Sequence, residues 1–236
     1  MPEAENFIAV DWRSGKDKCY FFFKDSNTYS RYDNNDDLVP EDYPKPINSS
    51  SWGDFHQHAK NLRFGFATSR HITANRVELD PDILWLFYYE GDTPMFCEYD
   101  QDVDSIRGLH TVAGSIWAPL LPYFDRIVAG TWWKKPHKFN LSNKYRFLLN
   151  DGNGLDLNWN TREVTLHTIN DDSWPGLKPY KYRITTAVQM NADFGDSYYF
   201  IFLTGKQYLK YNIDKNELAV GPRACNNKNW PGLFME

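Results

Sequence analysis

The sequence predicts an all-β protein, a four-bladed β-propeller formed by one chain of 236 residues. Three observations predict this fold. A short phrase that begins with Trp recurs at positions 52, 117, 174 and 230, an aromatic hairpin precedes each copy, and a strand with small residues precedes each hairpin. A unit of about four strands that is repeated around a ring is typical of a propeller, and ring closure protects most sheet edges.

The first element of each unit is a strand that contains small residues. Small side chains are needed where several backbones approach a common axis, so we expect these strands to surround the centre of the ring. The four copies are Phe7–Trp12, Leu62–Phe66, Ile127–Trp132 and Ile184–Val188.

The second and third elements form an aromatic hairpin. Turns that contain Gly, Asn or Asp separate its two strands, as tight hairpins require. With 16 Phe, 15 Tyr and 9 Trp, large rings supply much of the expected core. The strand pairs are Tyr20–Phe23 with Tyr29–Asp33, Leu84–Tyr88 with Phe96–Asp100, Tyr145–Leu148 with Leu155–Trp159, and Tyr199–Leu203 with Tyr208–Asn212.

Each unit ends in Trp, then small residues or proline, then an apolar residue. We expect Trp52, Trp117, Trp174 and Trp230 to be structural, each packed at the end of its blade while Gly or Pro shapes the turn. The blades then cover approximately residues 6–56, 61–122, 124–178 and 180–236, within a single domain that spans 1–236.

Together these phrases resemble the haemopexin-like family of four-bladed propellers. The Trp-Pro-Gly-Leu phrase and the Phe-x-Phe and Tyr-x-x-Tyr-Asp strands carry the resemblance over residues 6–236. A chain that forms one propeller alone is similar to the legume seed albumins of that family. The family's disulfide joins blade 1 to blade 4, but Cys19 and Cys225 do not match its positions. We therefore expect both residues, and Cys97, to be free thiols in a reducing compartment.

The resemblance also implies an axial channel in which main-chain carbonyls hold a calcium or sodium ion. It places the channel positions at Ala9, Arg63, Ala129 and Thr185, none of which is the Asp of the family pattern. Carbonyl ligation does not depend on the side chain, so an ion could still bind there, although Arg63 would oppose a cation unless it turns away. The alternative is that small residues only let four strands meet. Asp11 is the carboxylate nearest to the expected channel mouth.

The sequence predicts a ligand-binding protein that is not an enzyme. It contains no nucleophile elbow, HExxH helix, P-loop or glycine-rich dinucleotide turn. The resemblance implies a cation, a polyamine or haem as the ligand, and no motif singles out a haem-binding histidine among the six. The alternatives are a carbohydrate-binding lectin or defence protein, because exposed Trp and Tyr rings stack on sugars, and a scaffold for a protein partner.

Two further motifs have competing structural explanations. Asp100–Asp104 resembles the opening of a calcium-binding loop, but Ser105 and Thr111 stand where that loop needs Gly and Glu. We therefore expect a polar exit from a strand. His56 and His58 could face the same way, and we expect them to be surface histidines in a linker between blades.

Charge and hydropathy exclude other classes of protein. A net charge of −5 argues against nucleic-acid binding. The longest apolar runs, Ile83–Tyr89 and Tyr198–Leu203, are far shorter than the roughly 18 residues of a membrane-spanning helix. Met1–Glu5 is acidic and no apolar segment follows it, so we expect no secretory signal, and a cytoplasmic location or intracellular storage.

Overall fold

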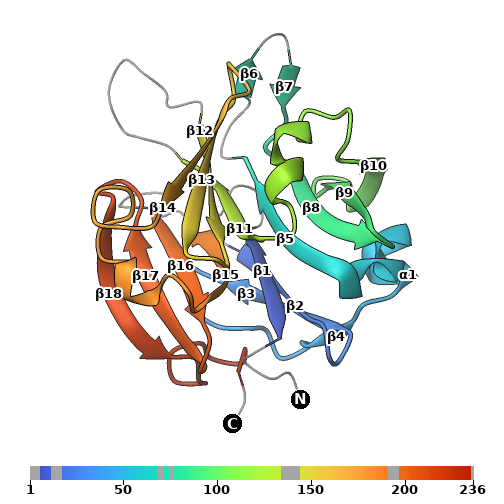
Figure 1. Ribbon diagram of the computed structural model, residues 1–236. Coiled ribbons are helices and arrows are strands. Elements are labelled where there is room, and N and C mark those ends of the chain that lie inside the picture. The colour runs from blue at the N-terminus through green and yellow to red at the C-terminus, as the bar shows by residue number, and fades with distance from the viewer. Residues whose placement is uncertain are drawn as a thin grey trace.

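The computed structural model describes residues 6–11, 18–68, 72–74, 77–133, 144–190 and 197–234. Four antiparallel sheets of four strands each surround one axis (Figure 1). The predicted all-β, four-bladed propeller is confirmed. Each sheet is formed by one continuous part of the chain. In the described part of the chain, no helix is long and apolar enough to cross a membrane.

The strands follow the predicted order of units. Blade 1 contains β1 (Phe7–Asp11), β2 (Lys18–Phe23), β3 (Thr28–Asp33) and β4 (Lys45–Pro46). Blade 2 contains β5 (Leu62–Ala67), β8 (Ile83–Glu90), β9 (Thr93–Asp100) and β10 (Ser105–Thr111), and carries a separate hairpin of β6 (Ile72–Ala74) and β7 (Val77–Leu79). Blade 3 contains β11 (Ile127–Trp132), β12 (Lys144–Leu149), β13 (Asn153–Asn158) and β14 (Val164–Thr168). Blade 4 contains β15 (Ile184–Met190), β16 (Tyr198–Leu203), β17 (Gln207–Asn212) and β18 (Glu217–Ala224).

Short helices connect the blades near the Trp phrases. They are α1 (Ser49–Trp52), η2 (Gly53–Gln57), η3 (Ala59–Asn61), η4 (Ala118–Tyr123) and η5 (Lys178–Tyr180). The Asn48 side chain caps α1 by accepting hydrogen bonds from the main-chain N–H groups of Ser50 and Ser51. Asn170 accepts equivalent bonds four residues before Trp174, so a local polar turn sets the position of the ring.

Each of the four predicted Trp residues is buried between two adjacent blades. Four aromatic clusters, one at each boundary between blades, form the core. Across the boundaries between blades, the ring centroids are 4.8 Å apart for Trp52 and Tyr99, 5.2 Å for Trp117 and Tyr145, 5.3 Å for Trp174 and Tyr211, and 5.0 Å for Trp230 and Tyr32. The large rings therefore stabilise the contacts between blades as well as each sheet.

The ring closes through an aromatic seam between blades 4 and 1. The Phe234 ring lies 5.3 Å from Phe7, and Val39 N–H donates a hydrogen bond of 2.9 Å to the Pro231 carbonyl. Gly232 has a φ of +77°, and a Cβ there would lie 3.0 Å from the Val39 carbonyl oxygen. The Gly of the Trp phrase thus permits both this turn and the close approach of the two blades.

The three cysteines are free and buried. Burial is the largest cause that raises the pKa of each thiol, so little reactive thiolate forms at neutral pH. We predict that Cys19, Cys97 and Cys225 react slowly with a thiol reagent in the native protein, and that all three titrate in denaturant. Titration of a single thiol in the denatured protein would reveal a disulfide instead.

Candidate functional site

The inner strands β1, β5, β11 and β15 lie next to one another around the axis. They do not bring the four predicted channel positions to one level. Ala9 pairs with Phe21 in the middle of β2, whereas Ala129 pairs with Leu148 nearer the hairpin turn of its blade. Arg63 and Thr185 lie at β-bulges, where a strand has one residue more than its partner.

Two basic side chains, Arg63 and Lys24, lie at one end of the ring, where Asp25 is also close to Lys24. Arg63 donates a hydrogen bond of 2.8 Å from Nη2 to the Asp125 carbonyl, which directs its guanidinium to the main chain just before β11. Burial, and then the charge of Arg63, lower the pKa of Lys24 to about 8. The Thr185 hydroxyl donates to the Phe202 carbonyl within its own blade. None of these three side chains is arranged to ligate a cation.

The other end of the inner strands contains the buried carboxyl of Asp11. This residue is only 3% exposed, and its Oδ2 accepts a hydrogen bond of 3.1 Å from the Ala67 N–H on the next inner strand. Burial raises the pKa of Asp11 to about 7. Among the residues that the structure describes, the buried hydroxyls of Tyr145 and Tyr199 have no hydrogen-bond partner, and the Asp11 charge adds to the effect of burial in raising their pKa. Asp11 therefore interacts with a residue of each of the three other blades, namely Ala67 through a hydrogen bond and Tyr145 and Tyr199 through its charge.

Further polar side chains link the inner strands near Asp11. The Thr131 hydroxyl on β11 donates to Oε1 of Gln189 on β15. The Ala9 N–H donates a bond of 3.2 Å to the Thr186 hydroxyl oxygen. We call Asp11, Thr131, Tyr145, Thr186, Gln189 and Tyr199 the axial polar cluster.

The axial polar cluster offers oxygen atoms and one carboxylate. In the residues that the structure describes, no group of three or more His, Cys, Asp or Glu could hold a metal ion. One carboxylate balances one positive charge, so this cluster is suited to a monovalent cation or a single ammonium group. A tight calcium site usually needs several charged oxygen ligands.

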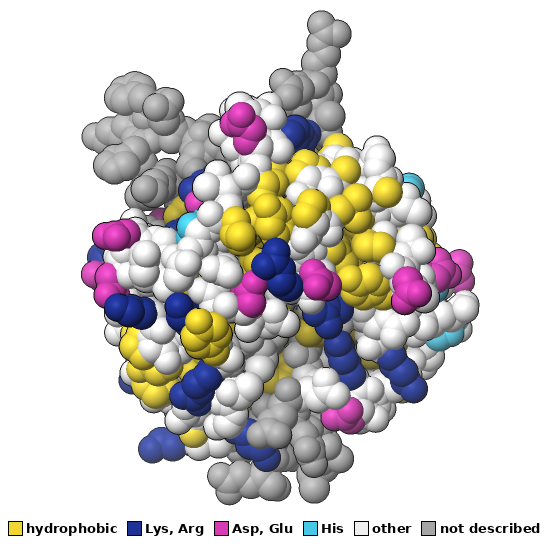
Figure 2. All heavy atoms as spheres, viewed as in Figure 1, with side chains coloured by type: hydrophobic (Ala, Val, Ile, Leu, Met, Phe, Trp, Pro, Cys, Tyr) yellow, Lys and Arg dark blue, Asp and Glu magenta, His cyan; other side chains and the backbone are white. Residues whose placement is uncertain are grey.

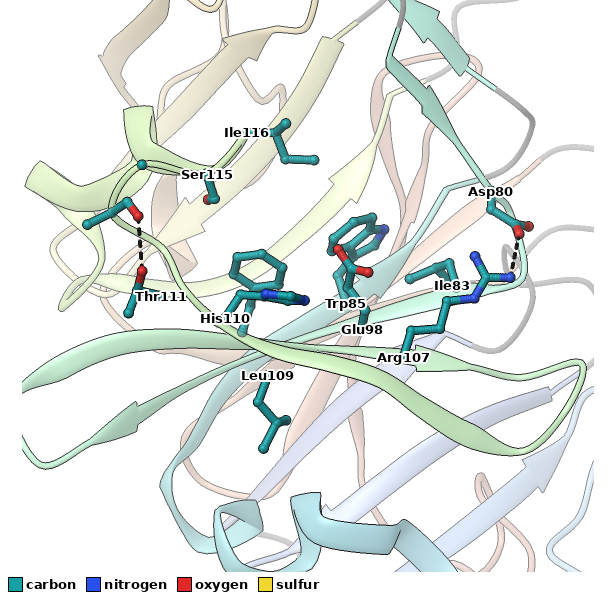
Figure 3. A pocket seen from close by; sticks show the side chains of 13 residues that line it. Asp80, Ile83, Trp85, Glu98, Arg107, Leu109, His110, Thr111, Ser115 and Ile116 are labelled. Carbon is teal, nitrogen blue, oxygen red and sulfur yellow. Dashed lines mark hydrogen bonds and ion pairs between the residues drawn. The ribbon is translucent and has the colours of Figure 1, made fainter.

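A separate cleft of about 720 Å³ opens on blade 2 (Figure 3). Trp85 and Phe96 contribute to its wall, Arg107 and His110 come from β10, and the Glu98 side chain lies between them. Gly108 pairs with Glu98 in the sheet, and the His110 ring fills the place that a side chain at Gly108 would take. No sequence motif indicates this cleft, because its residues come from three strands, from Asp80 before β8 and from the segment after β10.

Comparison with known protein families gives no match, and no curated protein matches the chain. Among solved structures, it resembles hydrazine synthase of Kuenenia stuttgartiensis at 8% identity with a TM-score of 0.32, over 95% of this chain and 50% of that one. A luciferin-regenerating enzyme matches at 10% identity with a TM-score of 0.38, over 93% and 75% of the two chains.

The β-propeller domain of Cps50 (Swd1) from Myceliophteria thermophila matches at 9% identity with a TM-score of 0.30, over 92% of this chain and 55% of that one. The chain thus spans about half the length of two of these three structures. These likenesses say nothing about what this chain binds. The haemopexin-like assignment stays a prediction.

The described histidines are dispersed over the propeller. His56 and His58 lie half-buried in the linker after α1, with the His58 ring 4.7 Å from Tyr88. His110 lies against Phe96, and burial lowers the pKa of His167. His71 and His137 lie outside the described residues.

The acidic stretch after β9 forms a turn. Asp100 Oδ1 accepts hydrogen bonds from the N–H groups of Asp102 and Val103, and its Oδ2 accepts one from Arg107. Asp33 makes the same kind of turn after β3. The stretch is therefore a polar exit from a strand, as predicted.

Few aromatic rings are available to stack on a sugar. All eight described Trp residues are buried, and Tyr182, at 70%, is the one large aromatic residue exposed in the described part of the chain. Figure 2 shows hydrophobic side chains gathered on the face that Figure 1 presents, over the region of blade 2 and η4. Ile116, Leu121 and Tyr123 are partly buried residues of this region.

Proposed function

We propose that this protein is a non-enzymatic binding protein whose axial polar cluster takes one positive charge, either a sodium ion or one ammonium group of a polyamine. The observation that carries the proposal is the buried Asp11 carboxyl, placed where the inner strands meet. No Lys, Arg or His of the described residues forms an ion pair with it.

A bound cation would offset the cost of this buried charge. Burial alone favours the neutral carboxylic acid, whereas a nearby cation favours the carboxylate. Main-chain carbonyls of the inner strands and the side-chain oxygens of Thr131 and Gln189 would supply further oxygen ligands. Calcium fits less well, because one carboxylate leaves half of its charge unbalanced.

The charge at the two ends of the ring favours a short ligand over a long polycation. Asp11 lies at the end of β1, whereas Arg63 and Lys24 lie at the opposite end of the inner strands. A second ammonium that reached that end would be repelled. One ammonium of a polyamine is therefore expected to enter beside Asp11, with the rest of the molecule extending outwards.

The other predicted ligands have less support. Haem needs a histidine beside an apolar groove. The axial polar cluster contains no histidine, and His110, which lies against Phe96, lines the separate cleft on blade 2. A lectin would use exposed aromatic rings to stack on sugars. Most aromatic rings of the described residues are instead buried between blades. No surface observation favours a particular protein partner.

The proposal predicts a pH-dependent affinity. Because the cation needs the Asp11 carboxylate, its affinity should rise about tenfold per pH unit below pH 7 and level off above it. Calorimetry with sodium, n-butylammonium, spermine and calcium at pH 5.5, 7 and 8.5 would measure this dependence. Hemin would be tested by its visible absorption spectrum.

Matched variants make the test specific. Asp11→Asn should abolish binding, whereas Asp54→Asn, which removes an exposed carboxyl in η2, should leave it unchanged. The proposal fails if none of these cations binds below about 1 mM, a weak limit for a specific site. It also fails if Asp11→Asn binds as the wild type does.

A further inference from the structure

The cleft on blade 2 contains a charged residue whose counterparts in the other blades contact an aromatic ring or an opposite charge within the protein. Strand pairing places Glu98 opposite Trp85. The same register holds Arg31 opposite Tyr20 in blade 1, Asp156 opposite Arg146 in blade 3, and Lys210 opposite Phe200 in blade 4. Each blade thus has one charged residue at this place on its third strand.

Three of these four charges have partners inside the protein. The Arg31 guanidinium lies 5.7 Å from the centre of the Tyr43 ring, and the Lys210 ammonium lies 3.9 Å from the centre of the Tyr198 ring. Asp156 accepts a hydrogen bond of 3.1 Å from Nε of Arg146 and also pairs with Lys144. Cation–π contacts and ion pairs of this kind offset the loss of water around each charge.

Glu98 differs from the other three. It is half-buried, and it makes no hydrogen bond or ion pair with any residue that the structure describes. The guanidinium of Arg107, which lies on the neighbouring strand β10 and lines the same cleft, is held by Asp100 at 2.6 Å and by Asp80 at 3.1 Å. Figure 3 shows the Arg107 guanidinium directed towards Asp80, away from Glu98.

Blade 3 shows which chemical group satisfies an acid at this position. The Arg146 guanidinium lies 3.9 Å from the centre of the Trp174 ring and 4.5 Å from that of Trp133, while it donates to Asp156. A smaller cavity of about 240 Å³ remains beside it. In blade 2 the residue that corresponds to Arg146 is Trp85, which carries no charge, and no Lys or Arg of the described residues forms an ion pair with Glu98. The cleft beside Glu98 measures about 720 Å³.

We infer that the blade 2 cleft binds a small planar organic cation that carries a guanidinium or amidinium group. Glu98 accepts its two parallel N–H donors, as carboxylates do with guanidinium groups. The apolar part of the ligand packs against the wall that Phe96 and Ile116 contribute. The volume lies within the range of about 300–1,000 Å³ found for small-molecule sites.

The experiment uses benzamidine as the probe and benzamide as its neutral counterpart, with binding followed by calorimetry. We expect saturable benzamidine binding to the wild type and at least tenfold weaker binding of benzamide. Glu98→Gln should weaken benzamidine binding at least tenfold, and its thermal unfolding should match that of the wild type because Glu98 pairs with no residue that the structure describes. Glu90→Gln, which neutralises an exposed acid at the end of β8, should bind as the wild type does.

Asp11→Asn separates this cleft from the axial polar cluster and should leave benzamidine binding unchanged. Three outcomes would overturn the inference. The first is that benzamidine does not saturate the wild type up to about 10 mM, a concentration far above the Kd of a specific site. The second is that benzamide binds as tightly as benzamidine, and the third is that Glu98→Gln binds benzamidine with unaltered affinity. Loss of binding in Asp11→Asn with retention in Glu98→Gln would place the cation at the axis alone.

Discussion

Replacement of Trp230 by Ala is expected to lower the free energy of unfolding by about 3–5 kcal/mol, the usual cost of removing a large buried ring. Trp230 is 2% exposed and lies in the seam between the first and last blades. Its ring contacts Tyr32 from blade 1 and Tyr208 from blade 4, at centroid distances of 5.0 and 5.3 Å. The variant therefore leaves a cavity that neither blade can fill alone. Denaturant unfolding measures the loss.

Two controls define the origin of that effect. Tyr182→Ala removes a ring that is 70% exposed and should change stability by no more than about 0.5 kcal/mol. Trp230→Phe retains an aromatic ring and should lie between the wild type and the Ala variant. If Trp230→Ala kept its full stability but lost ligand binding, the Trp phrase would be functional and the structural interpretation wrong.

Asp11→Asn is expected to stabilise the protein at pH 8 by as much as about 4 kcal/mol, and by little near pH 4. Burial raises the folded-state pKa of Asp11 from 3.8 to about 7. Between these values the folded state holds a proton that the unfolded state has lost. The free energy of unfolding therefore falls as the pH rises through this window, and the decrease ends above pH 7. An Asn side chain carries no such charge, and its Oδ1 can still accept the Ala67 N–H.

The measurement compares denaturant unfolding of the two proteins from pH 4 to pH 8 in a buffer without small cations. The difference between wild type and variant should grow with pH, and Asp54→Asn should show no such trend. Saturation with the cation proposed to bind at the axis should reduce the difference at pH 8, because the cation stabilises the carboxylate. A variant that is less stable than the wild type at pH 8 would contradict the burial argument.

The fold could be predicted from the sequence because each blade repeats the same local patterns. The Trp phrases mark the boundaries between blades, and their Gly and Pro residues shape the turns there. The pairs Tyr32-Asp33 and Tyr99-Asp100 mark equivalent strand ends, where each Asp caps the next turn. Such signals are local, so the sequence displays them without knowledge of the packing.

The channel positions could not be placed in the same way. An alignment of the inner strands by their aromatic residue matches Phe66 with Trp132. The pairing of these strands with their neighbours instead makes Ala67 the counterpart of Trp132. The β-bulges near Arg63 and Thr185 each add a residue that no periodic pattern reveals. The sequence predicts that Asp11 lies near the channel mouth. It does not predict that Asp11 is buried, because that burial depends on residues of the other blades.

The cleft residues were harder to find, since Glu98 and His110 are unremarkable as single residues. A usable signal existed in the repeats, because a charged residue precedes the last residue of the aromatic pattern in three blades: Arg31 before Tyr32, Glu98 before Tyr99 and Lys210 before Tyr211. That signal does not show which of these charges lacks a partner. Only the three-dimensional packing distinguishes Glu98 from the others.

Every sheet is formed by one continuous segment, so the hydrogen bonds within a blade do not depend on where the chain begins and ends. The Phe7 and Phe234 rings touch, so a short peptide could join the two ends while new ends are opened in the linker between blades 2 and 3. Such a circular permutant would retain all four sheets and the Trp230 seam.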